Sequence, residues 1–207
     1  MYIGIDVGTS EVKALLLSDR HEIVATSGAK LSIFRPAIGH CEQDPESWWL
    51  ATVESLQALR SKVPKEFAAA RAIGLSGQMH GAVLLDEADR VIRPAILWND
   101  TRSHQECADL MQEMPALAQI AGSLAMPGFT APKLRWVQRH EPGHFGRIRR
   151  VLLPKDFVRL KLTGEHVSDF SDASGTMWLD VAERRWSRTV LKLTGLDERQ
   201  MPGLVEG

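Results

Sequence analysis

The stretch Tyr2–Lys13, YIGIDVGTSEVK, decides how the rest of the chain is organised. Its first six residues are apolar or small except for Asp6, so they predict a buried strand that delivers a single carboxylate to its end. Gly8–Ser10 then predicts a tight turn, and the apolar run Val12–Leu17 predicts a second strand that returns beside the first. The sequence therefore begins with two paired strands rather than with a strand followed by a helix.

The turn between these strands has the features of a phosphate site. Its backbone N–H groups and the hydroxyls of Thr9 and Ser10 lie in one concavity, which suits phosphate oxygens. Asp6 at the same mouth is a hard ligand for Mg²⁺, which often binds carboxylates through water. Neither the P-loop nor the dinucleotide fingerprint applies, because no G-x-x-x-x-G-K-[ST] occurs and no helix directly follows the glycine. The alternative is that Asp6 only caps the turn.

Composition excludes several classes of protein. The 207 residues carry 25 Lys and Arg against 26 Asp and Glu, so no bulk field favours nucleic acid or a membrane surface. Cys41 and Cys107 lie far apart without metal-ligand spacing, so the sequence predicts neither a disulfide framework nor a zinc site and fits a reducing cytoplasm. The first residues lack the pattern of a signal peptide, and no apolar run reaches membrane-spanning length.

The chain up to residue 81 predicts a mixed sheet of an α/β fold. Ile23–Leu31 reads as a third strand, which completes an antiparallel meander. A helix is predicted from Pro45 to Lys62, and Ala72–Ser76 follows as a strand parallel to the first. We expect helices on both faces of this sheet. The strand ends in the loop Gly77–Gly81, a position where α/β folds usually contact ligands.

Polar residues follow two of the predicted strands and are candidate sugar contacts. Gln78 and His80 can each donate and accept hydrogen bonds, as sugar hydroxyls require, although His80 can equally be a satisfied loop histidine. Asn99 and Asp100 can bind hydroxyls beside an apolar wall formed by Trp98. Asp100 can also cap the helix predicted over residues 102–114, and both roles can coexist.

Two later segments complete the site prediction. Met126–Lys133 is rich in proline, so we expect an irregular loop that lies over the cleft. Ser168–Thr176 gathers hydroxyls and carboxylates, which favours helix capping and turns over ligand binding.

The pattern D-x-G-T-S-x-x-K at residues 6–13 resembles the first phosphate loop of sugar kinases in the actin and hexokinase superfamily, specifically the FGGY carbohydrate kinases. The resemblance implies an actin-like, ribonuclease H-like ATPase domain that uses ATP and Mg²⁺. It implies a catalytic and metal-binding role for Asp6 and phosphate contacts from Gly8, Thr9, Ser10 and Lys13. Glu11 departs from the family pattern, since a small residue is frequent there, and it must point away from the phosphates if the loop is functional.

The loop Gln78-Met79-His80-Gly81 resembles the substrate loop of family members that phosphorylate D-xylulose, whereas glycerol kinases typically carry Asn-Gln-Arg-Glu there. The run Trp98-Asn99-Asp100-x-Arg102 points the same way. The resemblance therefore implies sugar contacts from residues 78–81 and 98–100, and ATP-dependent phosphorylation of D-xylulose to D-xylulose 5-phosphate. Another pentulose or a polyol, or a non-catalytic sugar-binding fragment, are the alternatives.

The resemblance covers residues 1–207 and identifies them as the family's N-terminal, sugar- and phosphate-binding domain. The family's catalytic base is an Asp in a Gly-Asp-Asn element, which this sequence does not contain. We therefore expect that the C-terminal nucleotide-binding domain is absent and that the chain alone turns over little substrate. The six tryptophans leave open a homodimer or complete burial.

Overall fold

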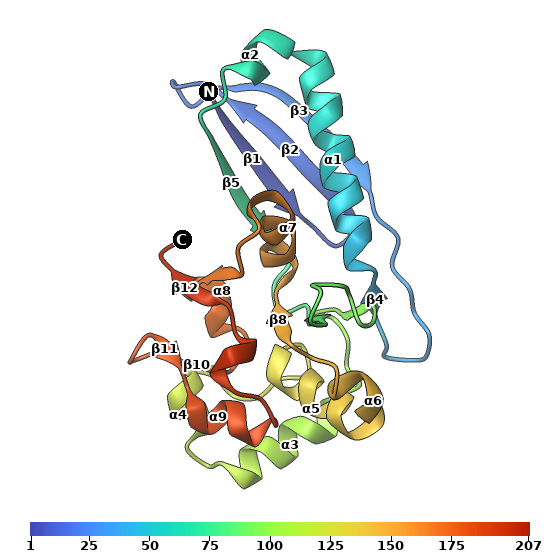
Figure 1. Cartoon of the computed structure of the whole chain (residues 1–207), viewed down its shortest axis with the longest axis vertical. Helices are drawn as coiled ribbons and strands as arrows, with labels where there is room; N and C mark the ends of the chain where they lie inside the picture. The colour runs from blue at the N-terminus through green and yellow to red at the C-terminus, as the bar shows by residue number, and fades with distance from the viewer.

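The computed structural model describes residues 1–207 and shows an elongated molecule (Figure 1). A four-stranded sheet with α1 and α2 forms one half, and most of the shorter helices form the other. The strands are β1 Tyr2–Val7, β2 Glu11–Leu17, β3 Ile23–Lys30, β4 Glu42–Gln43, β5 Ala72–Gly77, β6 Val83–Leu85, β7 Ala95–Ile96, β8 Arg150–Leu152, β9 Val167–Asp169, β10 Leu179–Asp180, β11 Arg185–Trp186 and β12 Gly203–Val205. The helices are α1 Pro45–Lys62, α2 Pro64–Ala68, α3 His104–Glu113, α4 Leu117–Ala121, α5 Thr130–His140, α6 Pro142–Phe145, α7 Pro154–Thr163, α8 Phe170–Ser174, α9 Arg188–Leu193 and the 3₁₀ turn Glu198–Gln200.

The main sheet has the order β3-β2-β1-β5. β1 pairs antiparallel with β2 and parallel with β5, and β2 pairs antiparallel with β3. The register sets Asp6 opposite Lys13 on one side and opposite Ser76 on the other. The predicted meander and parallel fourth strand are confirmed.

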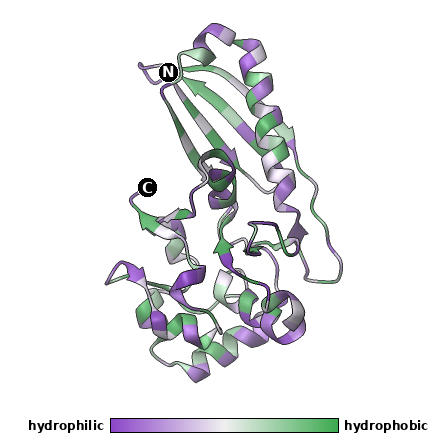
Figure 2. Ribbon diagram, viewed as in Figure 1, coloured by the Kyte–Doolittle hydropathy of each residue, from purple (hydrophilic) through white to green (hydrophobic).

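Helix α1 connects the meander to β5 and begins as the sequence predicts. The Asp44 side chain accepts a hydrogen bond from the Glu46 backbone N–H at 3.0 Å, and Pro45 occupies the first turn, where no backbone donor is needed. Figure 2 shows hydrophobic residues along the sheet and a mixture of hydrophilic and hydrophobic residues along α1, as expected for a helix with one solvent-facing side.

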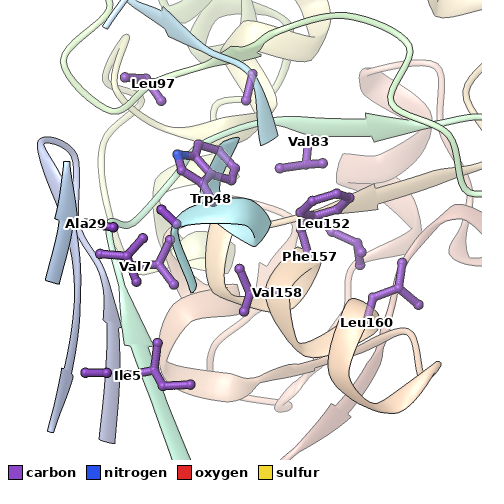
Figure 3. Close-up of a cluster of buried hydrophobic side chains, with 14 of the residues drawn as sticks. Ile5, Val7, Ala29, Trp48, Val83, Leu97, Leu152, Phe157, Val158 and Leu160 are labelled. Carbon is purple, nitrogen blue, oxygen red and sulfur yellow. The ribbon is translucent and has the colours of Figure 1, made fainter. Parts of the chain in front are cut away.

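Helices α1 and α7 cover the same face of the sheet. Figure 3 shows Trp48 of α1 and Phe157 of α7 on the side of the sheet that carries Ile5 and Val7, and these residues belong to one buried core. The prediction of helices on both faces is wrong for this sheet. Most side chains on its other face are small or polar, with Leu15 an apolar exception, so this face offers less apolar area to bury against a helix; the small and polar residues include Gly4, Asp6, Lys13, Gly28, Gly74 and Ser76.

A second core holds the rest of the chain together. It lies around Leu84, Ile96, Leu134 and Trp178 and joins the short strands to α3, α5 and α9. Trp98 is the one exposed tryptophan. None of the helices combines the length and the apolar character that a membrane-spanning helix needs.

We predict an irregular loop over Met126–Lys133, and this prediction is wrong for the last part of the segment. Helix α5 begins at Thr130, so Pro132 lies in its first turn, where the missing N–H has no carbonyl to bond. This places the Lys133 side chain on a helix, in the interior of the molecule.

Candidate functional site

The turn Gly8–Ser10 presents free backbone donors. The Gly8 N–H donates to the Glu11 carbonyl at 3.1 Å, and a Cβ on Gly8 would lie 2.7 Å from that oxygen, so only glycine fits. The N–H groups of Thr9 and Ser10 have no acceptor within the chain. Two adjacent unsatisfied N–H groups at a tight turn can hold an anionic oxygen.

Asp6 lies on the open face of the sheet, in what we call the sheet groove. This groove of about 900 Å³ is lined by the strands on both sides of Asp6, including Lys13 and Ser76. Asp6 is exposed and forms no ion pair, so its carboxylate is free to take a ligand. No cluster of three or more His, Cys, Asp or Glu side chains is arranged to hold a metal. A metal at Asp6 would therefore rely on one carboxylate, water and ligand oxygens, a pattern common for Mg²⁺.

Glu11 does not point away from this groove. It lines the same groove, extends over Gly28 and pairs with the exposed Lys30 at 3.1 Å. Lys30 thereby partly compensates the negative charge of Glu11, and the carboxylate lies toward β3 rather than toward the turn Gly8–Ser10.

A second space, the loop pocket, lies between the loop Gly77–Gly81 and helix α8. Its volume is about 410 Å³, and Met79 and His80 line one side. The opposite side is lined by Lys155, Asp169, Ser171, Asp172, Ser174 and Gly175. Ser76 lines both the loop pocket and the sheet groove, so the two spaces meet at the end of β5.

His80 is held in an unusual conformation. Its φ is 63°, in the left-handed region that few residues with a side chain adopt. Its ring packs edge-on against Phe129 with centroids 4.7 Å apart, and its Nδ1 is buried against Gly175 with no hydrogen-bond partner. Burial, together with the charge of Lys133, lowers the pKa of His80 to about 4, so the imidazole is neutral at pH 7.

Gly81 completes this loop because no larger residue fits. A Cβ there would lie 2.6 Å from Pro154 at the start of α7. Backbone packing therefore explains its place in the predicted loop.

Gln78 has a different environment from the one we predicted. It is buried, and its Nε2 donates to the Gln43 side chain at 2.9 Å and to the Gly8 carbonyl at 3.3 Å. Its Oε1 accepts from the Thr9 hydroxyl at 3.1 Å. Both donors of the amide and one lone pair of Oε1 are therefore used within the protein, and a sugar contact from Gln78 stays a prediction.

Thr9 joins three segments through one hydroxyl. Its Oγ1 donates to Gln78 and accepts from the Trp98 indole N–H at 3.0 Å. The hydroxyl is thus engaged, and the backbone N–H is the donor of Thr9 that remains free for a ligand. Trp98 is 45% exposed and lies at the edge of this region, next to the exposed Asn99.

Gln43 is not among the residues predicted from the sequence, yet its side chain organises this region. Its Nε2 donates to the Thr9 carbonyl at 2.7 Å and to the Ser32 carbonyl at 3.1 Å. Its Oε1 accepts from the Trp48 indole N–H at 3.0 Å and from Gln78. All four hydrogen-bonding positions of the amide are occupied.

Asp100 is a structural anion. Its carboxylate makes a bidentate ion pair with Arg102, at 2.7 Å for the shortest contact, and accepts from the Cys41 N–H at 2.5 Å. Arg102 also pairs with Glu42 at 2.7 Å. The residue is 1% exposed and both of its oxygens have partners in the protein, which favours a structural role; a sugar contact from Asp100 stays a prediction.

Lys155 gathers the carboxylates of the loop pocket. Its Nζ lies 2.6 Å from Asp156, 2.8 Å from Asp169 and 2.9 Å from Asp172. Burial opposes its charge, but the carboxylates outweigh burial and raise the pKa of the ammonium. The sequence favours capping for the segment Ser168–Thr176, and Asp169 does cap α8, but this segment and Lys155 also line the pocket.

Comparisons with known proteins agree with one another. Residues 1–207 match the FGGY family of carbohydrate kinases, N-terminal domain. The chain is 55% identical to the xylulose kinase of Escherichia coli over 207 residues, which is all of this chain and 42% of that protein. A crystal structure of a xyloylose kinase from Brucella ovis superposes with a TM-score of 0.98 at 56% identity, over 100% of this chain and 43% of that one. The xylulose kinase of Rhodospirillum rubrum superposes with a TM-score of 0.94 at 29% identity, over 98% of this chain and 42% of that one.

Proposed function

Because the chain belongs to the FGGY family of carbohydrate kinases, we propose that it forms the sugar- and phosphate-binding part of an enzyme that transfers the γ-phosphoryl group of ATP to D-xylulose. The chain has the family's actin-like fold, and relatives named xylulose kinase support the choice of sugar. The chain spans 42% of the length of the Escherichia coli xylulose kinase, so the complete reaction is part of the proposal.

One observation carries this proposal: the loop pocket and the sheet groove meet at Ser76. A pentulose held beside Met79 and His80 would place a hydroxyl near the end of β5, where Asp6 and the turn Gly8–Ser10 also lie. Phosphoryl transfer depends mainly on such positioning and on charge neutralisation.

Each residue has a defined task in the proposed reaction. The N–H groups of Thr9 and Ser10 hold phosphate oxygens, and Lys13 adds positive charge from β2 within the sheet groove. Asp6 orients the water shell of Mg²⁺, an ion that neutralises phosphate charge when bound with the nucleotide. The neutral His80 imidazole contacts sugar hydroxyls, and Met79, Trp98 and Asn99 complete the sugar side.

We assign no catalytic base within residues 1–207. Asp169 and Asp172 line the loop pocket and both pair with Lys155. Burial opposes the charge of Asp169, but contacts with Lys155 outweigh burial and lower its pKa, whereas burial raises the pKa of Asp172. Neither residue lies in the Gly-Asp-Asn pattern of the family's base. We therefore place the base and the adenosine contacts outside this domain and expect the 207-residue chain to bind sugar with negligible turnover.

Isothermal titration of the chain with D-xylulose, D-ribulose and glycerol tests the proposal. We expect heat of binding for D-xylulose, none for glycerol, and loss of binding in His80→Ala. His104→Ala is the matched control, because His104 is exposed on α3 and lines neither space. Binding of glycerol equal to that of D-xylulose, or unchanged binding in His80→Ala, would reject the proposed sugar site.

A coupled assay with ATP, Mg²⁺ and D-xylulose separates binding from catalysis. Sugar binding without product formation fits the proposed division of labour. Rapid phosphorylation by the chain alone would mean that a base lies among these residues, and it would overturn the assignment above.

A further inference from the structure

Lys133 is a buried ammonium without a carboxylate partner. It lies on the first turn of α5 with an exposed fraction of 0%, and no Asp or Glu approaches it within ion-pair distance. Its Nζ instead donates to two backbone carbonyls, those of His80 at 2.8 Å and Gly128 at 2.6 Å. Burial of an ammonium group costs free energy, and the hydrogen bonds to the two carbonyls offset part of that cost.

One of these two carbonyls belongs to a residue that lines the loop pocket, and the other belongs to the segment that packs against that residue. One is His80, whose left-handed backbone turns the loop Gly77–Gly81. The other precedes Phe129, whose ring packs edge-on against the imidazole of His80. The Thr130 hydroxyl adds a second donor to the His80 carbonyl at 3.2 Å. One ammonium therefore fixes both the backbone of His80 and the segment against which its ring packs.

Gly128 extends the same support to the loop after β7. A Cβ on Gly128 would lie 2.5 Å from the carbonyl oxygen of Trp98, so the two backbones are in direct contact. Displacement of Gly128 would thus also move Trp98.

Few charged groups act on Lys133. Asp100 favours its charge and Arg102 opposes it, both from the loop after β7, and His80 is the titratable group of the loop pocket that it influences. Burial lowers the pKa of Lys133 to about 7. The neutral amine retains two N–H donors, which suffice for the two carbonyls, so deprotonation changes the charge beside His80 more than it changes the hydrogen bonds.

We propose that Lys133 is the positioning residue of the sugar pocket, which sets the backbone and ring of His80 from behind without touching the sugar. This inference rests on the proposed function for the identity of the ligand. Its geometric part, the control of His80 by Lys133, does not depend on which sugar binds.

The test uses Lys133→Met, which keeps the length of the side chain but removes its donors and charge. Lys192→Met is the control, because Lys192 is exposed on α9 and its side chain makes no polar contact. Histidine side-chain NMR follows the titration of His80, and isothermal titration follows D-xylulose. We expect the His80 midpoint to move upward and sugar affinity to fall roughly tenfold in Lys133→Met, with both unchanged in Lys192→Met.

The outcomes separate the inference from the proposed function. A folded Lys133→Met with an unchanged His80 midpoint and unchanged affinity would overturn the positioning role. Failure of the wild-type chain to bind any tested sugar would count against the proposed function, while the His80 titration would still decide the control by Lys133.

Wild-type protein provides the test if Lys133→Met does not fold. With ¹⁵Nζ-labelled lysine, the His80 resonances should show an inflection at the same pH at which the Lys133 signal titrates. Titration of Lys133 with no response at His80 would refute the inference.

Discussion

Replacement of Gln43 by leucine should destabilise the chain far more than its position on a two-residue strand suggests. The change keeps the approximate volume but removes four hydrogen bonds, those to Thr9, Ser32, Trp48 and Gln78. Ser32 is exposed, so water can replace its partner, and Gln78 retains the Gly8 carbonyl. The indole N–H of Trp48 is fully buried and the Thr9 carbonyl is partly shielded, so these two groups lose most.

An unsatisfied buried polar group costs about 1–3 kcal/mol. Two such groups predict that Gln43→Leu lowers the free energy of unfolding by about 2–6 kcal/mol. Urea denaturation monitored by tryptophan fluorescence measures this directly. Gln57→Leu is the matched control, because Gln57 is exposed on α1 and its side chain makes no hydrogen bond; its effect should stay within about 0.5 kcal/mol. A loss below about 1 kcal/mol in Gln43→Leu would refute the reasoning and indicate that water or leucine packing compensates.

Three further predictions follow from the site. Asp100→Asn should lower the free energy of unfolding by about 3–5 kcal/mol, because it leaves the buried charge of Arg102 poorly compensated. Sugar affinity measured by titration calorimetry should stay the same. Unchanged stability with a loss of sugar affinity would instead support a sugar contact from Asp100. In the enzyme that contains this chain, Asp6→Asn should reduce turnover roughly 100-fold with little change in sugar affinity, and a selective loss of sugar affinity would contradict the metal role. Burial lowers the pKa of Lys133 from 10.5 to about 7, so between these pH values the unfolded chain binds one more proton than the folded chain. The free energy of unfolding should therefore rise with pH in this range, by up to about 1.4 kcal/mol per pH unit from this group. Urea titrations at pH 7, 8 and 9 should therefore show wild type gaining stability relative to Lys133→Met, whereas a constant difference would mean that Lys133 stays protonated.

The first 81 residues were the easiest part of the fold to predict, because local signals there agree with the final packing. Alternation in β1 and β2, and the Asp44–Pro45 start of α1, each have a local physical cause. The empty face of the sheet was not predicted. The apolar residues of β1 indicate that one face of the sheet is buried. The residues between them are small or polar, which leaves little apolar area to pack a helix against the other face, a consequence that we did not predict from the sequence.

The candidate site was predicted by residue type but not by partner. His80 and Met79 line a pocket as the loop pattern suggested, and Asp6 is free. Gln78 and Asp100 are equally suited to a sugar and to an internal amide or guanidinium, and only the fold brings Gln43 and Arg102 to them. The Lys155 cluster was missed for the same reason, since its carboxylates come from three separate positions in the sequence.

The shared hydroxyl of Thr9 has a thermodynamic consequence. Since one atom joins the turn Gly8–Ser10 to Gln78 and Trp98, the ordering of either segment restricts the other before its own ligand arrives. A sugar that orders its loop would thus reduce the conformational entropy that the turn loses when a phosphate binds, and so raise the affinity for phosphate. By thermodynamic linkage, bound phosphate would raise the affinity for the sugar by the same factor. If the domain binds sugar and phosphate as proposed, the two ligands are therefore expected to bind with positive cooperativity, transmitted through a single side chain.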